Sequence, residues 1–466
     1  MIAIIGGGAS GLLAAIQIGL QATVPCRVAL YDPAEYPSGG LAYGTRDLAH
    51  LLNVPAGRIS ALPDQPDHFL KWLRRPGNVA GLLRDERVSE TDFVPRAIYG
   101  CYLFALLEET YSRPGCAARL DIRSTRVIDF IPARNGGTVV SADGDTEDVS
   151  HVVLALGNLP PRDPLPAHPF FRSPRYVAQV WQKGAISMDS PGDDVLLVGS
   201  GLTAVDVILS LERAGHRGKY FVTSRGGRWP QSHGAAGPYA GVSADQLPTG
   251  NIRRLVRFIR EEIRSVGPEH WRGVIDALRP HTQNLWKALS IEERRRFLRH
   301  VRPFWESHRH RMPQSAWAEL ERLRKEGRLE LFPGRLRDFE EDEEGVTARI
   351  QPKKAGGDIR SIRAGKVFNC IGPESNFRQH FNEPLLINLL ARGVLHPDPL
   401  FLGLEANENL EPVGAKGHAF EQISLIGPPL KAMLWESTAI PEIRQQAALV
   451  ASRALRHQHL QPSWEI

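Results

Sequence analysis

Two glycine-rich turns constrain this chain of 466 residues more than any other feature. The first turn, at residues 6–11, has the spacing Gly-x-Gly-x-x-Gly, follows an apolar run at residues 2–5 and precedes the helix-forming run Leu-Leu-Ala-Ala-Ile. Its glycines allow a tight turn, close approach of the backbone to a pyrophosphate, and close packing of a helix on a strand. The free N–H groups at the helix start then face phosphate. The turn therefore predicts a dinucleotide-binding unit at the beginning of the chain.

The strand expected after this turn supports the same interpretation. Residues 27–31 form an apolar run that ends at Asp32, about where a carboxylate accepts hydrogen bonds from ribose hydroxyls in such units. An acidic residue that merely ends a surface strand is the alternative. We expect FAD at this site, bound by Gly6, Gly8, Ala9, Ser10, Gly11 and Asp32.

The second turn, at residues 199–204, repeats the design as Gly-x-Gly-x-x-Ala. The next apolar run ends in Ser224 and Arg225 instead of an acidic residue, so nothing there repels a ribose 2′-phosphate and a guanidinium could bind it. NADPH is favoured over NADH, which remains possible, and Arg225 as a solvated loop charge is the alternative. The predicted ligands are Gly199, Gly201, Leu202, Thr203, Ser224 and Arg225.

The length of the chain and its internal parallels predict two domains. Each glycine unit is followed, much later, by an apolar strand that runs into a glycine, Gly157 and Gly372. The expected fold class is α/β, with two Rossmann-like dinucleotide-binding domains, the second inserted in the first, plus a helical insertion. The FAD-binding domain would comprise residues 1–165 and 373–466, and the NAD(P)H-binding domain residues 166–372. Segments 118–140 and 329–350 are expected to form meanders that close the two domains.

The insertion expected at about residues 240–327 is rich in arginine and histidine. Its apolar residues recur at helical spacing, for example at Ile252, Leu255, Val256, Ile259 and Ile263. The basic residues could form a pocket for an acidic or polar substrate, and a solvated helix face is the alternative. The histidines lack the spacing of metal ligands, so no metal site is expected.

Composition argues against several other classes of protein. The net charge is +5, but the 57 basic and 52 acidic residues are mixed along the sequence, which disfavours nucleic-acid binding. The four cysteines are far apart and form neither a CxxC pair nor a metal-ligand pattern, which argues against a disulfide reductase. With neither a signal-peptide pattern nor a long uncharged apolar run, we expect a cytoplasmic protein without a membrane partner.

Several longer motifs carry a family resemblance that runs from residue 1 to about residue 450. Segments GLAYG at 40–44, HLLNVPA at 50–56, FVPR at 93–96 and LWESTAIPEIR at 434–444 resemble a bacterial FAD/NAD(P)-binding protein family. That family is related to flavin-containing monooxygenases and N-hydroxylases. The resemblance implies a single-component hydroxylase that acts through a flavin C4a-hydroperoxide, with dioxygen, on a small polar molecule. Hydroxylation of a purine, urate, is among the activities associated with the group. The chain departs from the family at Gly226, where members commonly have a second arginine.

The resemblance also implies site residues. Residues 50–56 should line the flavin ring, and residues 427–429 should place a helix that begins near Trp435 with its positive end towards the flavin. Asn53 and Glu436 are the catalytic candidates, although Asn53 could equally satisfy loop backbone and Glu436 could be a helix-start carboxylate without a chemical role. The remaining predicted cofactor ligands are Tyr43, His50, Leu52, Asn53, Arg96, Val127, Gly157, Gly372, Gly427 and Trp435.

Arg96 directly follows Pro95 at an expected helix start, where a guanidinium and a helix N-terminus both favour an FAD phosphate. An exposed surface arginine is the alternative. Phe171 and Trp181 occupy the ends of the Baeyer–Villiger fingerprint FxGxxxHxxxW, but Ser173 and Val177 replace its glycine and histidine, so that reaction is disfavoured. Two other functions remain open: a flavin-dependent NAD(P)H reductase or dehydrogenase without oxygen insertion, and a non-catalytic regulatory protein that binds both cofactors.

Overall fold

The computed structural model describes residues 1–34, 39–78, 88–236, 239–353, 357–379 and 383–458. By its contacts the chain divides into two units. Unit 1 consists of Met1–Arg46, Val54–Leu159 and Ser375–Ile466, and unit 2 of Asp47–Asn53 and Pro160–Glu374. The predicted domain limits, after residues 165 and 372, compare with unit junctions after Leu159 and Glu374. The prediction assigns all residues before 166 to the FAD-binding domain. The short segment Asp47–Asn53 instead belongs to unit 2, although both flanking segments belong to unit 1.

Unit 1 is built on a parallel sheet of five strands in the order β15-β7-β1-β2-β3. The central strands β1 and β7 are fully buried apolar runs apart from His151, as expected for a parallel sheet that is covered on both faces. The strands are β1 (Ile2–Ile5), β2 (Cys26–Tyr31), β3 (Ala118–Arg123), β7 (His151–Leu154) and β15 (Ile423–Leu425).

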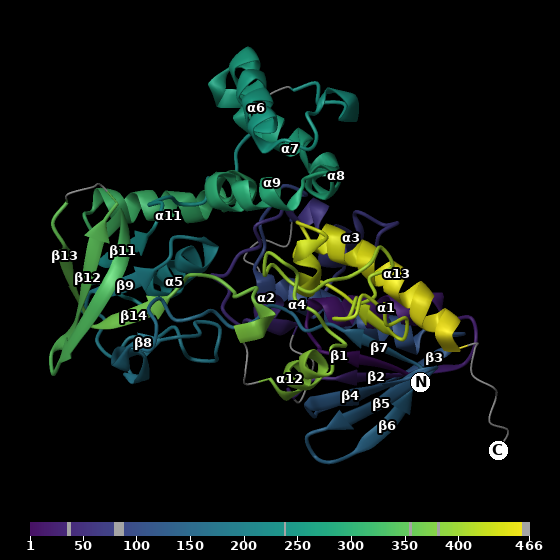
Figure 1. Ribbon diagram of the computed structural model, residues 1–466. Coiled ribbons are helices and arrows are strands. Elements are labelled where there is room, and N and C mark those ends of the chain that lie inside the picture. The colour runs from purple at the N-terminus through teal and green to yellow at the C-terminus, as the bar shows by residue number, and fades with distance from the viewer. Residues whose placement is uncertain (35–38, 79–87, 237–238, 354–356, 380–382, 459–466) are drawn as a thin grey trace. The chain divides into compact units, whose positions relative to one another are not determined.

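Helix α1 (Ala9–Gln21) packs against α13 (Ile440–Gln458) and α4 (Arg96–Ser112) in unit 1, as Figure 1 shows. A separate antiparallel sheet contains β4 (Val127–Ala133), β5 (Gly136–Ser141) and β6 (Thr146–Val149), and helix α12 (Pro384–Ala391) packs on β4. The shorter helices are α2 (Gly40–Tyr43), η1 (Ala56–Arg58), α3 (His68–Leu73), η7 (Phe377–Gln379) and η8 (Pro428–Ala432).

Unit 2 contains a sheet of seven strands in the order β13-β12-β11-β10-β9-β14-β8. The neighbouring strands from β11 through β10, β9 and β14 to β8 pair parallel, whereas β12 pairs antiparallel with both β11 and β13. The strands are β8 (Tyr176–Val177), β9 (Val195–Val198), β10 (Tyr220–Ser224), β11 (Leu329–Asp342), β12 (Gly345–Pro352), β13 (Arg360–Ala364) and β14 (Lys366–Asn369). Both units therefore have the βαβ arrangement of a dinucleotide-binding fold, which confirms the predicted fold class.

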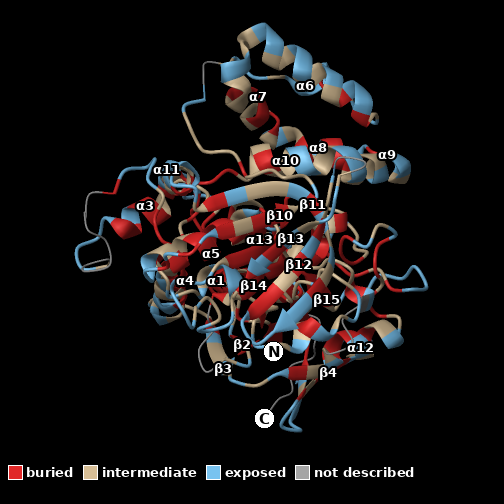
Figure 2. Cartoon of the chain, turned by 90° about the vertical axis from the view of Figure 1, so that its left-hand side faces the viewer, coloured by how far each residue is buried: buried red, intermediate tan, exposed pale blue. Residues whose placement is uncertain are grey.

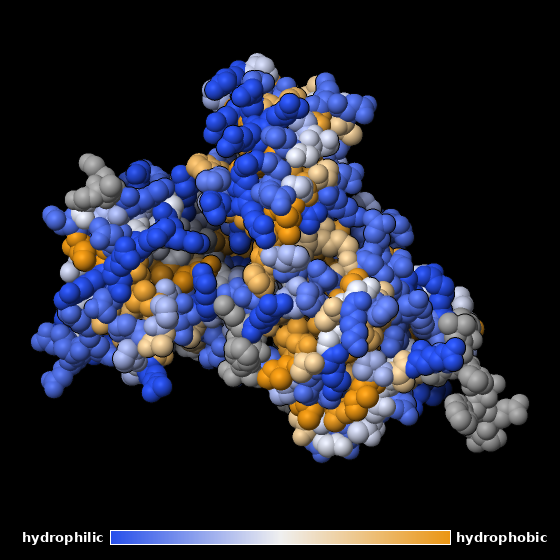
Figure 3. Space-filling model, viewed as in Figure 1, coloured by the Kyte–Doolittle hydropathy of each residue, from blue (hydrophilic) through white to orange (hydrophobic). Residues whose placement is uncertain are grey.

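Helices α5 (Leu202–Arg213) and α11 (Gln314–Lys325) contribute buried residues to the main core of unit 2. The insertion between β10 and β11 is helical, with α6 (Ile252–Val266), α7 (Trp271–Ala277), α8 (Thr282–Lys287), α9 (Ile291–Arg296), the π-helix η6 (Phe297–Val301) and α10 (Arg302–Arg309). Short 3₁₀ helices are η2 (Pro169–Arg172), η3 (Ala244–Gln246), η4 (Pro268–His270) and η5 (Arg279–His281). Buried residues concentrate in the strands, whereas α6 is mostly exposed or half-buried (Figure 2) and hydrophilic on the face shown in Figure 3.

Three local expectations were wrong in part. Residues 118–123 do not belong to a meander but form β3, which pairs parallel with β2, whereas the rest of the segment from Val127 lies in the antiparallel strands β4 and β5 as expected. The first half of β11 likewise pairs parallel with β10 before the strand turns to β12. The helix expected to begin near Trp435 begins at Ile440, after a series of turns, because Pro441 is tolerated only in the first helical turn.

In the described part of the chain, no helix is both long and apolar enough to cross a membrane.

Candidate functional site

The first glycine turn connects β1 to α1. Gly6 has a positive φ of 110°, and a side chain at this position would overlap the carbonyl oxygen of Ala155 at the end of β7. A side chain at Gly11 would overlap the carbonyl oxygen of Gly6 itself. Both positions therefore require glycine for the turn and the helix to pack this closely.

The second glycine of this turn, Gly8, has a different surrounding. Among the described residues, a Cβ atom built on Gly8 would meet Gly40 alone, at 3.5 Å from its Cα atom. Gly40 has a positive φ of 68°, and its own Cβ would lie 3.0 Å from the Cα atom of Gly8. The GLAYG segment therefore packs its backbone directly against the turn at the N-terminus of α1.

Asp32 lies at the end of β2 and holds the loop around the turn. Its carboxylate accepts hydrogen bonds from the backbone N–H of Gly7 at 2.7 Å and of Ala34 at 2.9 Å. A carboxylate has about four acceptor positions, so these two bonds leave capacity for ribose hydroxyls. This geometry fits the predicted role of Asp32 as a ribose ligand.

Unit 1 also contains buried polar atoms that a bound cofactor could satisfy. Among the described residues, the hydroxyl groups of Tyr99 and Ser437 are buried without a hydrogen-bond partner. The ring of Tyr99 lies 4.7 Å from that of Tyr43, which belongs to the GLAYG segment, and burial raises the pKa of both hydroxyls. A buried unpaired hydroxyl is costly, which supports a polar ligand in this unit.

Gly427 joins this region to the C-terminal part of the chain. It has a positive φ of 80°, and a side chain there would overlap the hydroxyl group of Ser10 in the first turn of α1. Its backbone N–H donates to Gln446 Oε1 at 2.8 Å. The residues of unit 1 thus fit a dinucleotide such as FAD, and Gly427 lies beside Ser10 at the start of α1.

The second glycine turn connects β9 to α5 in unit 2. Gly199 has a positive φ of 115°, and a side chain there would overlap the carbonyl of Cys370 at the end of β14. A Cβ atom built on Gly201 meets no atom within 4 Å in the described residues, so this position faces open space. Ala204 follows at the third position and is fully buried.

The end of β10 lies beside this turn. The hydroxyl oxygen of Ser224 lies 2.7 Å from that of Ser200, and the Ser200 hydroxyl donates to the carbonyl oxygen of Arg228 at 2.6 Å. Arg225 is exposed. Arg228, which the sequence did not single out, lies with its guanidinium 4.2 Å from the ring centroid of Phe304, and a Cβ atom at Gly226 would lie 2.9 Å from its Nη1 atom. Arg228 therefore occupies the space beside Gly226.

The segment Asp47–Asn53 is fastened to unit 2 by side chains of α5. Nε2 of His50 lies 2.8 Å from Ser210 Oγ, which donates to Asp47 Oδ2 at 2.6 Å. Burial raises the pKa of the Asp47 carboxyl, but hydrogen bonds from Ser210 and from the backbone of Ala49 outweigh it and hold that pKa below its ordinary value. His50 is 3% exposed, so it is part of a packed anchor.

Asn53 ends this segment, and its carbonyl oxygen lies 3.0 Å from Nε2 of His233. Burial lowers the pKa of His233, which leaves the imidazole neutral near pH 7. Neither Ser210 nor His233 was predicted, because each acts on a segment far away in the sequence. The predicted residues His50 and Asn53 are thus positioned by unit 2.

The other predicted residues lie on both units. Gly157 and Gly372 have positive φ values and open space around a built Cβ atom, which no described atom approaches within 4 Å. Arg96 is the first residue of α4 and is half-buried. Glu436 is only 4% exposed. Leu52, Val127 and Trp435 are buried, whereas Ala9, Leu202 and Thr203 are half-buried at the starts of α1 and α5.

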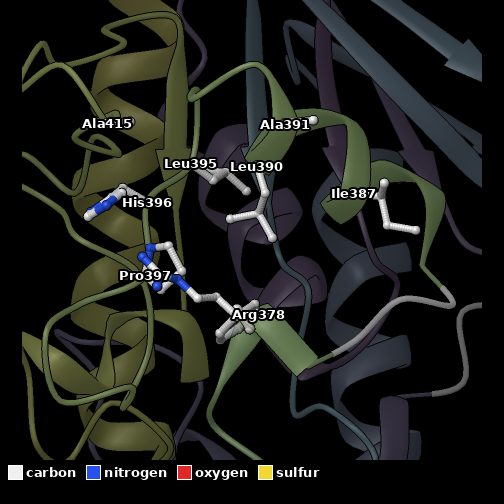
Figure 4. A pocket seen from close by; sticks show the side chains of 9 residues that line it. Arg378, Ile387, Leu390, Ala391, Leu395, His396, Pro397 and Ala415 are labelled. Atoms are coloured by element: carbon white, nitrogen blue, oxygen red, sulfur yellow. The ribbon is translucent and has the colours of Figure 1, made fainter.

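A pocket of about 430 Å³ lies in unit 1 and contains none of the predicted residues. Its lining is mostly apolar, and Arg378 and His396 are its basic members (Figure 4). The imidazole of His396 lies 3.3 Å from the carboxylate of Glu405. The lining residues are Phe377, Arg378, Ile387, Leu390, Ala391, Leu395, His396, Pro397 and Ala415.

Comparisons with known proteins agree with this geometry. Residues 3–159 match the model of a protein family described as FAD-NAD(P)-binding. No curated protein matches the chain in sequence.

Solved structures match over nearly the whole chain. An ornithine N-hydroxylase from Kutzneria sp. 744, with reduced FAD, NADP⁺ and L-ornithine, has a TM-score of 0.64 at 13% identity over 98% of this chain and 99% of that chain. An L-lysine 6-monooxygenase from Pseudomonas syringae has 0.61 at 17% identity over 98% and 99%. A cadaverine monooxygenase from Erwinia amylovora, bound to FAD, has 0.64 at 14% identity over 97% and 94%.

At these identities the similarity to solved structures concerns the fold. The match over residues 3–159 covers the first glycine turn, Asp32 and the strand that ends before Gly157. Residues 3–159 are therefore similar to a family of FAD-NAD(P)-binding proteins, and the chain shares its fold with these hydroxylase and monooxygenase structures.

Proposed function

We propose that this protein is an FAD-dependent, NAD(P)H-linked monooxygenase that hydroxylates a small polar molecule. The observation that carries the proposal is the presence in one chain of two strand-to-helix glycine turns of similar design, with positive φ at Gly6 and at Gly199. Two dinucleotide sites suit an enzyme in which one nucleotide reduces the other. The similar folds of ornithine, lysine and cadaverine hydroxylases support oxygen insertion as the reaction.

In unit 1, the backbone of residues 6–11 would hold the FAD pyrophosphate at the N-terminus of α1, and Asp32 would accept hydrogen bonds from the ribose. When bound there, FAD would supply the redox chemistry that links NAD(P)H to dioxygen. Arg96 at the start of α4 remains a predicted phosphate ligand. Glu436 and Asn53 remain the predicted residues at the reacting end.

In unit 2, the backbone around Gly201 would hold the nicotinamide nucleotide at the N-terminus of α5. Ser224 and Arg225 follow β10, and neither is acidic, so the site accepts a ribose 2′-phosphate and favours NADPH over NADH. Arg228 adds a second guanidinium close to the same turn. Arg228 would take the place of the second arginine that members of the similar family commonly have where this chain has Gly226.

Asn53 would contact substrate or reduced oxygen at the flavin, since the HLLN segment is predicted to line the ring. His233 contacts the backbone carbonyl of Asn53, and Ser210 contacts the side chain of the nearby His50. These contacts fix the main chain from which the Asn53 side chain projects. A held donor needs little reorganisation during reaction. The substrate remains open: the similar structures act on amines and amino acids by their names, and none supports a purine such as urate.

Rapid mixing tests the proposal against its two alternatives. The purified yellow protein is reduced without oxygen by NADPH or NADH and then mixed with dioxygen. A monooxygenase should show a transient absorbance that differs from oxidised and reduced flavin, with peroxide released only slowly. Immediate reoxidation with stoichiometric peroxide, with every substrate tried, would support the reductase. Failure of both nucleotides to reduce the flavin would support the regulatory protein.

A further inference from the structure

The helical insertion of unit 2 gathers basic side chains around Trp271, the first residue of α7. The guanidinium carbon of Arg272 lies 4.6 Å from the centroid of the Trp271 ring, and that of Arg311 lies 5.7 Å from it. The ring of His308 meets Trp271 edge-on at 4.8 Å between centroids. We call Trp271, Arg272, His308 and Arg311 the Trp271 cluster.

The two arginines of this cluster differ in their partners. Arg311 is 4% exposed and forms an ion pair with Asp276. Burial lowers the pKa of Arg311, and the carboxylate of Asp276 opposes that shift. In contrast, Arg272 has no carboxylate within ion-pair distance among the residues that the structure describes. The cluster therefore carries a positive charge that the described part of the chain does not neutralise.

Arg272 is nevertheless held in place. Its Nε and Nη2 atoms donate to the carbonyl oxygen of Ser232 at 3.2 and 3.0 Å. A Cβ atom at Gly234 would lie 3.2 Å from Nε, so the guanidinium packs directly on the backbone of this loop. A guanidinium has five N–H donors, and these two bonds leave donors for a further acceptor. A half-buried, fixed arginine with spare donors is suited to bind an anion.

The loop that holds Arg272 also holds Asn53. Ser232, which accepts from Arg272, directly precedes His233, whose Nε2 lies 3.0 Å from the Asn53 carbonyl oxygen. His233 is close enough to Arg272, Arg311 and Asp276 for all three charges to affect its pKa. One short loop thus connects the unneutralised cation to the residue predicted to act at the reacting end of the substrate.

We propose that Arg272, fixed by Ser232 and Trp271, binds a carboxylate group of the substrate. This inference rests on the proposed function, and it narrows the substrate to small molecules that carry a carboxylate. The planar guanidinium pairs with a carboxylate through two parallel hydrogen bonds, which also orients the bound molecule. The Arg-rich insertion then has a role in substrate selection as well as a solvated surface on α6.

Calorimetric binding to the FAD-loaded protein, with and without NADP⁺, tests the inference. The probes are two matched pairs that differ by one carboxylate: L-lysine against cadaverine, and L-ornithine against putrescine. At least one amino acid should bind, and its amine partner should bind at least about tenfold more weakly, equivalent to about 1.4 kcal/mol. Absence of binding by both amino acids, or equal binding within each pair, would overturn the inference.

Arg272→Gln should weaken binding of the amino acid about tenfold or more and remove the preference over the amine. The matched control is Arg264→Gln on α6, an exposed arginine, which should bind like the wild type. Arg272→Lys keeps the charge but loses the planar fork and should fall between the two. Unchanged binding by Arg272→Gln would contradict the assignment.

Two further measurements separate this inference from the proposed function. Thermal unfolding of Arg272→Gln shows whether the protein is folded, and Arg272→Lys replaces it in the assay if it is not. Mixing of the reduced variant with dioxygen, without substrate, should give the wild-type flavin transient. If Arg272→Gln shows the wild-type flavin transient but no longer binds the amino acid, both the monooxygenase function and the carboxylate site are supported. If the wild type binds the amino acid in preference to its amine but shows no flavin transient, the carboxylate site alone is supported.

Discussion

The two glycine turns use the same design but differ at their third position. Gly6 and Gly199 have nearly equal φ values of 110° and 115°, and a side chain on either would overlap a carbonyl at the end of the neighbouring strand. At the third position, a side chain on Gly11 would overlap the carbonyl of Gly6, whereas unit 2 has Ala204 there. The first position is therefore fixed by the turn itself, and the third by how closely each helix approaches its turn.

The strands that follow the two turns differ in charge. Asp32 uses its carboxylate to accept the backbone N–H groups of Gly7 and Ala34. In unit 2 the neutral hydroxyl of Ser224 takes a similar place, since it lies 2.7 Å from Ser200 Oγ and accepts the N–H of Gly227 at 3.0 Å. A carboxylate at the end of this strand favours a ribose with free hydroxyl groups, whereas a neutral residue there tolerates a ribose 2′-phosphate. The two units thus present a different charge at the end of the strand that follows each glycine turn.

The largest effect should come from Gly11→Ala. Its methyl group would overlap the carbonyl of Gly6, so helix α1 must move away from the turn. Overpacking of this kind costs about 3 kcal/mol, and we expect lower thermal stability together with loss of bound flavin. Unfolding curves and the ratio of flavin to protein absorbance measure both. Wild-type stability in this variant would mean that the two helices approach their turns equally closely.

Alanine at the second glycine should separate ligand binding from folding. Gly8 and Gly201 lack a positive φ, and their built Cβ atoms come no closer than 3.5 Å to the atoms described around them. We expect Gly8→Ala to lower the affinity for FAD and Gly201→Ala to raise the KM for NADPH, each by about tenfold. The free energy of unfolding of the cofactor-free proteins should stay within about 0.5 kcal/mol of the wild type.

The result is informative only if each variant affects its own nucleotide. Gly201→Ala should bind FAD normally, and Gly8→Ala, reconstituted with excess FAD, should keep the wild-type KM for NADPH. A crossed effect would show that the two turns do not serve separate dinucleotides.

Local features of the fold could be predicted, because their cause lies within a few residues. The turn at Gly6, the strand that ends at Asp32 and the helix start at Arg96 all depend on adjacent sequence. The anchoring of His50 by Ser210 could not, since these residues are 160 positions apart and no periodicity marks such a pair. The grouping of residues 47–53 with unit 2 could not be predicted either, because chain order does not reveal which unit a short segment packs against.

The next prediction concerns the end of β10. Arg225 is exposed and positively charged beside the second turn, so Arg225→Ala should reduce the preference for NADPH over NADH about fivefold in kcat/KM. Steady-state kinetics with both nucleotides measure this ratio. Arg217→Ala provides a control, since Arg217 is an exposed arginine before the same strand and outside the turn. An unchanged ratio in Arg225→Ala would assign the 2′-phosphate to another group, and Arg228→Ala would then be the variant to measure.

The smallest effect should come from Ala204→Gly, the reverse substitution at the third position of the second glycine turn. Ala204→Gly removes a fully buried methyl group and adds backbone freedom inside α5, without any overlap to relieve. Glycine costs about 1 kcal/mol relative to alanine in a helix, so unit 2 should lose about that much stability. Thermal unfolding of the two variants side by side provides the comparison. Equal losses in Ala204→Gly and Gly11→Ala would show that the third position is set by helix propensity, whereas a clearly larger loss in Gly11→Ala supports the closer approach of α1 to its turn.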